Sequence, residues 1–389
     1  MLYSKNNSAI DIRTIPIHFL KCILPALLEK RYLLPFLLFW FSSNPATAAE
    51  DRHFDLPLML GPQYPIMYMS TTFVPDSAFT LPQGDFFFQF RYLETNSYAF
   101  SSNFHQNENM EEMTNQFNSE KQQGYAAFID GELHRKIVRF HLGLLEEMEV
   151  QLVYRDIKFS GGHLDATIEN FHSNFNLGNQ KREDTDRDVL NFYVVDKETG
   201  ESVFQLTDSS PHYHTESLTL GVKYIFYWGE SDAASFRILS NFGDRYMERD
   251  INEVPDEKKR SHHNFNDGVV GIHYSKHFER WTLHAALAVA EVKNSLFEKS
   301  PDYIAYAFCG GSWHASDNWD ILAQTLYYTS PYPEYSSSQL GRNIVELTAG
   351  FHWFFTSYAS LDFGFVENHT QGAQNIDITF FSALNLQFS

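Results

Sequence analysis

Ionisable and amide side chains recur at every second position along segments whose other residues are mainly apolar. Because successive side chains of a β-strand point to opposite faces, this pattern predicts strands with one polar and one apolar face. An Arg or Lys side chain facing lipid at mid-bilayer costs about 2–4 kcal/mol, so we expect the polar set to face the lumen of a barrel. The lumen-lining candidates are Arg139, His141, Glu149, Gln151, Arg155, Lys223, Arg237, Asn241, His273, His284, Glu346, His352, Asp362 and Asp377.

Two chemical roles are open to these inward side chains. Acidic and basic groups are mixed in the set, and a barrel of about twelve strands is narrow, so the groups could pair and fill the lumen. They could also line a narrow polar passage for small solutes. The four His residues of the set come from different strands, and their spacing does not predict a metal site. We expect neither a metal nor a cofactor.

A catalytic site is the competing chemistry. His172, Ser173 and Asn174 are adjacent and supply residue types that outer-membrane phospholipases use. A helix, however, separates adjacent side chains by about 100°, whereas a nucleophile needs its base within hydrogen-bond reach. The sequence also contains no glycine-rich phosphate loop and no CxxC pair. We therefore predict that the protein is not an enzyme, and keep a lipid-modifying enzyme as the less favoured alternative.

The elements that must position the polar set are predicted strands. In residues 375–389 the alternation runs for a dozen residues, whereas a strand needs about nine to eleven to cross a bilayer at a tilt. Phe388 lies one residue before the last, Ser389, and resembles the aromatic residue on which the final strand of bacterial outer-membrane barrels ends. The resemblance implies recognition by the barrel-assembly machinery. The predicted strands are residues 86–100, 129–144, 148–159, 217–228, 235–243, 269–278, 281–292, 303–314, 319–329, 344–356, 358–366 and 375–389.

Short and long connections alternate along the chain. Tight turns follow every second strand, and the polar linkers between these pairs are longer. Short turns at one end and long loops at the other are typical of outer-membrane barrels, with the turns in the periplasm. A soluble β-sandwich has no reason to keep this pattern. The sequence therefore predicts an all-β protein, a closed antiparallel transmembrane β-barrel of about twelve strands over residues 85–389.

Composition agrees with this fold class. Aromatic residues make up 16% of the 389 residues, and no run of about 18 apolar residues follows residue 50. Residues 1–49 read as a signal peptide, with an apolar run after Lys30 and Arg31 and a cleavage site near Ala48-Ala49. They carry five Lys/Arg and two Asp/Glu, so the remaining chain has a net charge of −20 − 3 = −23. That balance argues against nucleic acid as a partner.

Residues 50–84 form a proline-rich N-terminal segment that also contains many apolar side chains. Proline at this density excludes a helix or a central strand. Exposed to water, the apolar side chains would be a liability, so we expect the segment to be periplasmic or packed in the lumen. A plain linker is the alternative.

The connection at residues 160–216 is the longest. Asp165–Leu177 places Ile168, Phe171 and Phe175 at helical spacing, which predicts a short amphipathic helix in an extracellular loop. These three side chains are expected to anchor the helix on the barrel rim or in the outer leaflet. Residues 193–204 predict a small hairpin after it.

The same loop resembles a known family. Ser160-Gly161-Gly162-His163-Leu164-Asp165, Ile168-Glu169, Phe171-His172, Phe175 with Gly178, and Arg182-Glu183-Asp184 are similar to the signature of the domain of unknown function 3187. Leu81-Pro82-Gln83-Gly84-Asp85 is also similar. Asn179-Gln180 stands where the family has a proline and a second glycine. The resemblance implies an outer-membrane-type barrel over most of residues 56–388, and it brings no catalytic or binding residues.

Taken together, these patterns predict a protein of the bacterial outer membrane. The favoured function is a narrow passive channel or uptake barrel for small solutes, and the alternative is a structural or surface-binding barrel. The expected partners are outer-membrane lipid, the barrel-assembly machinery and an unidentified small solute.

Overall fold

The computed structural model describes residues 56–64, 67, 73–100, 125–174, 186–196, 202–207, 213–248, 260–292, 301–331, 342–368 and 378–388. The chain divides into two units, Met1–Thr47 and Ala48–Ser389, and all described residues belong to the second. The expected signal peptide and its cleavage near Ala48-Ala49 lie outside the described residues. So do Phe175 and Asp377, and the side chain of Phe171 is not described either.

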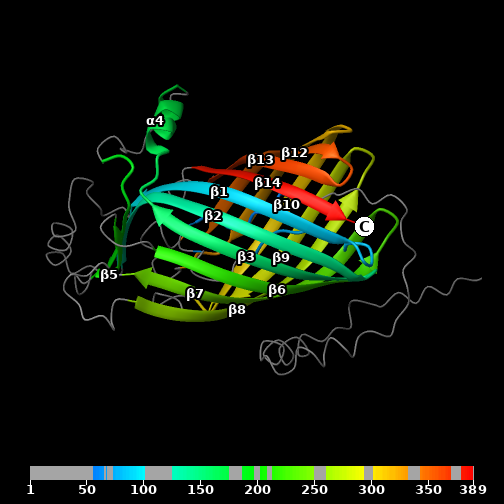
Figure 1. The fold of residues 1–389 in the computed structure, drawn as a ribbon, viewed down its shortest axis with the longest axis horizontal. Coiled ribbons are helices and arrows are strands. Elements are labelled where there is room, and N and C mark those ends of the chain that lie inside the picture. The colour runs from blue at the N-terminus through cyan, green and yellow to red at the C-terminus, as the bar shows by residue number, and fades with distance from the viewer. Residues whose placement is uncertain are drawn as a thin grey trace, which may run out of the picture. The chain divides into compact units, whose positions relative to one another are not determined.

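One antiparallel sheet of fourteen strands contains all the described strands, and twelve of them, without β4 and β5, form the barrel wall (Figure 1). β1 pairs with both β14 and β2, which closes the barrel and leaves no free edge. The predicted closed antiparallel barrel is confirmed. The wall strands are β1 (Phe86–Phe100), β2 (Tyr125–Leu145), β3 (Met148–Ser160), β6 (Tyr213–Trp228), β7 (Asp232–Glu248), β8 (Arg260–His277), β9 (Trp281–Glu291), β10 (Tyr303–Ser316), β11 (Trp319–Tyr328), β12 (Ile344–Thr356), β13 (Ala359–Asn368) and β14 (Ile378–Phe388).

Several strands are longer than the sequence pattern predicts. β7 continues to Glu248 and β8 starts at Arg260, whereas the pattern predicts strands that end at residue 243 and start at residue 269. The hydrogen-bond ladder there needs no apolar face, because it satisfies the backbone of each strand whatever the side chains are. Hydrophobic alternation therefore marks only the part of each strand that faces lipid.

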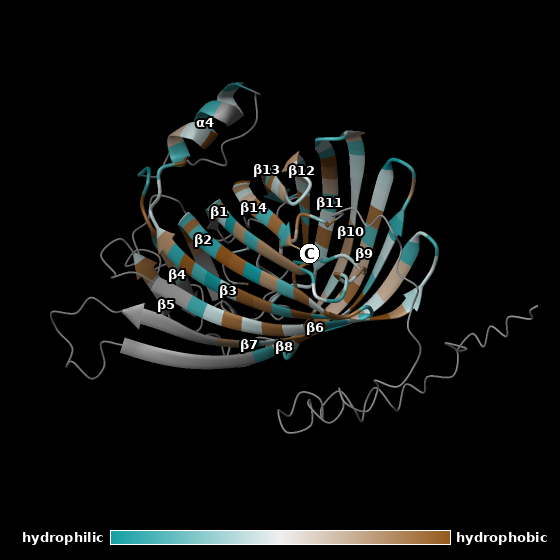
Figure 2. Ribbon diagram, turned by 45° about the vertical axis from the view of Figure 1, so that its right-hand side comes forward, coloured by the Kyte–Doolittle hydropathy of each residue, from teal (hydrophilic) through white to brown (hydrophobic). Residues whose placement is uncertain are grey.

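Large apolar side chains cover the outside of the wall, and Figure 2 shows polar and apolar residues alternating along the wall strands that are drawn in colour. In water, an exposed apolar surface of this extent would drive association, whereas lipid accommodates it. The protein is therefore an outer-membrane β-barrel. Exposed examples are Phe90, Phe140, Leu142, Leu152, Leu220, Ile272, Leu287, Leu347, Phe351 and Phe380.

Among the described residues, no helix is long and apolar enough to cross a membrane.

The facing of the strands gives a first prediction. Leu220 is 49% exposed on the outer surface of β6, so Leu220→Arg places a charge in lipid and is expected to destabilise the barrel by about 2–4 kcal/mol. Leu220→Phe keeps the position apolar and is the matched control. Urea unfolding of both variants in lipid vesicles measures the difference. Equal stability of the two variants would contradict the assigned outer face.

The long connection after β3 holds a hairpin and a helix. β4 (Asn191–Asp196) pairs with β2 at residues 125–130, beyond the end of β3, and β5 (Ser202–Thr207) pairs with β4. The predicted small hairpin is confirmed. α4 runs from Asp165 to Asn174, and residues 175–177 of the predicted helix lie outside the described residues.

Candidate functional site: the barrel lumen

The described residues between Leu56 and Thr80 lie inside the barrel. We call residues 56–80 the inner segment; its described parts are residues 56–64, 67 and 73–80. Leu56 contacts the barrel near the short turns, Gln63 contacts it near the long loops, and Thr80 bonds to the β2–β3 turn. The inner segment therefore enters and leaves the lumen at the same end of the barrel.

Barrel side chains bind the main chain of the inner segment. Five of them donate hydrogen bonds to its carbonyl oxygens: Arg91 to Leu58 (2.5 Å), Arg139 to Met59 (3.1 Å), Arg237 to Val74 (2.6 Å), His273 to Asp76 (3.2 Å) and His352 to Leu56 (3.0 Å). Three others accept from its backbone N–H groups: Gln324 from Leu58 (3.1 Å), Glu346 from Gln63 (2.7 Å) and Ser275 from Ala78 (2.8 Å). Charged and polar side chains of the wall thus satisfy the hydrogen-bonding groups of a main chain that forms no helix or strand of its own.

Asp76 is the one buried carboxylate of the inner segment's described part. Lys223 donates to its Oδ2 at 3.3 Å, Gln151 donates to the same atom at 2.7 Å, and Arg237 lies 3.8 Å from it. Burial alone would raise the pKa of Asp76, but the positive charges of Lys223 and Arg237 lower this pKa below its ordinary value. Asp76 is therefore an ionised anchor between the inner segment and the wall.

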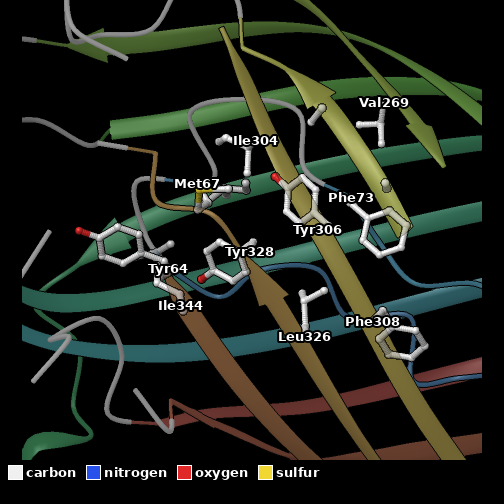
Figure 3. Packing of buried hydrophobic residues seen from close by; sticks show 14 of the residues in the cluster. Tyr64, Met67, Phe73, Val269, Ile304, Tyr306, Phe308, Leu326, Tyr328 and Ile344 are labelled. Carbon is white, nitrogen blue, oxygen red and sulfur yellow. The ribbon is translucent and has the colours of Figure 1, made fainter. Parts of the chain in front are cut away.

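Apolar contacts also hold the inner segment to the wall, as Figure 3 shows for the cluster around Tyr64, Met67 and Phe73. The Phe73 ring lies 5.6 Å from that of Tyr306. A second cluster packs Leu58 and Leu60 against the wall. Such contacts add dispersion and desolvation energy to the polar ones. The lumen is thus built like a mixed protein core.

The predicted lumen-lining residues can be placed in this frame. The thirteen candidates other than Asp377 are at most 7% exposed, and they lie on the wall positions that alternate with the exposed apolar ones. His141 and Glu149 pair at 2.9 Å, and His352 pairs with Asp362 at 2.6 Å. The alternation of polar and apolar side chains along each strand therefore identified residues that the structure buries inside the barrel.

Charge is less evenly mixed in the lumen than the sequence analysis expects. All six buried Lys and Arg side chains of the described residues lie on five consecutive strands, β1, β2, β3, β6 and β7: Arg91, Arg135, Arg139, Arg155, Lys223 and Arg237. We call this group the basic wall. Among the side chains that the structure describes on β8 to β14, the buried Asp, Glu, Lys and Arg are all acidic: Asp267, Asp320, Glu346 and Asp362. The linear sequence conceals this separation because it depends on which strands are neighbours around the barrel.

One small cavity lies between the inner segment and the basic wall. Its volume is about 20 Å³, and it lies among Gly61, Gln63, Arg135, Arg139 and Arg155. One water molecule needs about 10–15 Å³ of such space. In the described part of the chain, this cavity admits water and no larger solute.

A second polar cluster lies outside the lumen, where β1 and β2 approach the start of α4. Its members are Glu94, Glu132, His134 and His163. The sequence analysis did not predict this cluster, because polar residues at the end of a strand are also expected wherever a strand extends beyond the membrane. His134 Nε2 and Ser160 Oγ are 2.8 Å apart, which is the serine–histidine contact of a nucleophilic site. The nearby N–H groups of His163 and Leu164, however, already donate to Glu132 Oε1. They are not available to stabilise an oxyanion.

The expected helix anchors are only partly described. Ile168 is buried at 4% exposure. Ser173 and Asn174 of the adjacent triplet are exposed, and the side chain of His172 is not described. Arg187 pairs with Glu169, which ties the chain after α4 back to the helix.

Comparison with solved structures finds other barrels at low identity. The P. putida toluene transporter TodX is 10% identical, with a TM-score of 0.38 over 79% of this chain and 91% of that one. The NanC porin is 6% identical, with a TM-score of 0.39 over 77% and 99%. The outer membrane protease OmpT from Escherichia coli is 8% identical, with a TM-score of 0.31 over 80% and 99%. At these values the likeness carries no inference about function.

No curated protein matches the chain in sequence. A family model, by contrast, matches residues 55–388, which include the inner segment, the twelve wall strands and the loop with α4. The match agrees with the resemblance found in the loop after Ser160. The chain belongs to the family described as "Protein of unknown function (DUF3187)".

Proposed function

We propose that the protein is a passive channel or uptake barrel for small solutes, closed by its own inner segment. The observation that carries the proposal is that the charged wall binds the main chain of a segment that is not part of the wall. Water can replace each of these hydrogen bonds, so their net stabilisation is modest, at about 1.5–3 kcal/mol for a bond to a charged group. The inner segment can therefore leave without stranding the wall charges.

The path of the inner segment supports this reading. Both of its ends lie at the short-turn end of the barrel, so it can withdraw toward the periplasm without threading through the wall. Barrels of eight strands fill their interior with side chains, whereas barrels of 16–18 strands leave an aqueous channel. A wall of twelve strands lies between these sizes. Withdrawal of the inner segment would therefore open a narrow water-filled path.

The basic wall indicates which solutes such a path would favour. Six cationic side chains on five neighbouring strands would face the open lumen, with Glu149 as the main acid among them. A one-signed surface in a narrow cleft concentrates ions of the opposite sign. We therefore propose a preference for small anions or for solutes with a carboxylate or phosphate group.

A planar-bilayer recording tests this function. Openings of the purified full-length protein under voltage are expected to show a reversal potential in a KCl gradient that reports preference for chloride over potassium. Arg155→Gln removes one charge of the basic wall and is expected to reduce that preference. Lys136→Gln is the matched control, because Lys136 is exposed outside the lumen. A barrel that never conducts under any condition would instead favour the structural or surface-binding role.

A further inference from the structure

We propose that the cluster outside the lumen is a binding site for one divalent transition-metal ion, with Zn²⁺ the best fit. The ligands are Glu94 of β1, Glu132 and His134 of β2, and His163 of the segment that leads into α4. Two imidazoles with two carboxylates form a ligand set that zinc accepts in a tetrahedral arrangement. This site is independent of the channel proposed for the lumen.

The distances within the cluster support coordination. His163 Nδ1 lies 3.4 Å from Glu94 Oε1 and 3.7 Å from Glu132 Oε2, and His134 Nδ1 lies 3.6 Å from Glu94 Oε1. These separations are long for hydrogen bonds. Metal–ligand bonds of about 2.0–2.2 Å in a tetrahedron place neighbouring ligand atoms about 3.4 Å apart. The three separations lie close to that value.

Two carboxylate oxygens of the cluster lack hydrogen-bond donors. Glu132 is fully buried, and its Oε1 accepts hydrogen bonds from the N–H groups of His163 and Leu164. Within the described residues, Glu132 Oε2 and Glu94 Oε1 are buried atoms without a hydrogen-bond partner. These are the two oxygens that face His163 Nδ1. A buried carboxylate oxygen without a donor is costly, and a bound cation would offset that cost.

The surroundings of the cluster orient its ligands. His134 Nε2 lies 2.8 Å from Ser160 Oγ, so an N–H at Nε2 can donate to Ser160 and leave Nδ1 as the metal ligand. Gly162 has a φ of +83°, and a Cβ there would lie 1.8 Å from the Glu132 carboxyl carbon, so only glycine lets the loop approach so closely. Tyr92 Oη, 3.0 Å from His134 Nδ1, must turn away when the metal binds.

The cluster lies in a region that an ion can reach. His163 is 69% exposed. Two exposed lysines lie beside the cluster on the outer surface: Lys158 of β3 is paired with His134, and Lys136 lies two residues nearer the short turns on β2. Because charged side chains avoid lipid, the lipid boundary lies nearer the short-turn end than the cluster does. In the lumen, Asp76, His141 and Glu149 also lie close enough together to hold an ion. There Lys223 Nζ already lies 3.3 Å from both carboxylates and supplies the positive charge.

A metal ion at the cluster would join the loop to the wall. Three ligands belong to β1 and β2, and the fourth precedes α4 by two residues. Binding would therefore restrain the loop that contains α4, because the ion stabilises only the arrangement that brings His163 to the wall.

Zinc titration of the full mature protein tests this proposal. Untagged protein in detergent is treated with EDTA, dialysed, and titrated with ZnCl₂ by calorimetry. The wild type is expected to bind one Zn²⁺ more than His163→Ala or Glu132→Gln. The latter keeps an acceptor for the two loop N–H groups, and His163 is largely exposed, so both variants should fold. His277→Ala and Tyr92→Phe are the matched controls and should keep the site.

Limited trypsin digestion gives a second measurement. Zn²⁺ is expected to slow cleavage between residues 160 and 188 in the wild type and to have no such effect in His163→Ala. The proposal is overturned if His163→Ala and His277→Ala bind the same number of zinc ions with the same affinity. The cluster would then be a network of histidine–carboxylate pairs without a metal.

Discussion

Deletion of residues 56–80 is expected to turn the closed barrel into a continuously conducting pore. The deletion removes every described hydrogen bond between the inner segment and the wall, and it leaves the closed ladder from β1 to β14 untouched. The ladder satisfies the backbone in lipid, so the barrel is expected to insert and fold. Water then hydrates the charged side chains of the wall and replaces the carbonyl groups that the deletion removes.

Planar-bilayer currents of the deleted and full-length proteins measure this effect at equal voltage. The full-length protein is expected to be closed for most of the recording, and the deleted protein to be open throughout. Heat-modifiable migration on a gel checks that both proteins fold. A deleted protein that folds and stays closed would show that wall side chains alone fill the lumen, and the channel proposal would fail.

Asp76→Ala is expected to cause the largest loss of stability of any single substitution in the inner segment. The substitution leaves Lys223 and Arg237 buried without the carboxylate that both face. Removal of one partner from a buried ion pair typically costs about 3–5 kcal/mol. Because the inner segment then loses its ionised anchor, the protein should also open more often under voltage.

Unfolding in urea, followed by tryptophan fluorescence, measures the cost of Asp76→Ala. Asp302→Ala is the matched control, because Asp302 is exposed next to β10. Its substitution is expected to change the free energy of unfolding by less than about 0.5 kcal/mol. If both variants unfold at the same urea concentration, Asp76 is not an anchor of the inner segment.

The wall of this barrel follows directly from its sequence, because lipid imposes a strict rule on one face of each strand. Arg91 and Arg135 obey the same alternation as the fourteen predicted residues, and the same reasoning would have found them on β1 and β2. The strand ends were less predictable. The residues that β7 and β8 add beyond the predicted strands are mostly polar in the sequence, so the apolar pattern stops before the ladder does.

The position of the inner segment could not be chosen from the sequence alone. Its prolines exclude a central strand, and its apolar side chains must be shielded from water. Both properties fit a packed position in the periplasm as well as one in the lumen. The contacts that hold it run largely from wall side chains to its main chain, as between Arg91 and Leu58. Such contacts leave no pattern in the residue types of the segment. Asp76 is the exception, because it is the only charged residue of residues 56–80.

The cluster outside the lumen could not be predicted from the sequence for a different reason. Glu94, Glu132 and His134 alternate with inward residues and resemble solvated positions beyond the membrane. Only the register of β1 against β2 brings Glu94 opposite His134, and only the turn after Ser160 brings His163 back to them. Neither the register between these strands nor the path of a loop can be read from local spacing.

The central claim is that opening requires displacement of the inner segment, and a reversible tether tests it most directly. Ser77 Oγ and Ser275 Oγ lie 3.4 Å apart, one on the inner segment and one on β8. Replacing both with cysteine in a background with Cys22→Ala and Cys309→Ala allows a disulfide with little change in side-chain size. The measurement is single-channel conductance under voltage, before and after reduction with dithiothreitol. Each single-cysteine variant serves as a control.

We expect the oxidised double variant to stay closed, and its openings after reduction to match those of the single-cysteine controls. Openings of equal frequency and size in the oxidised and reduced protein would contradict the account.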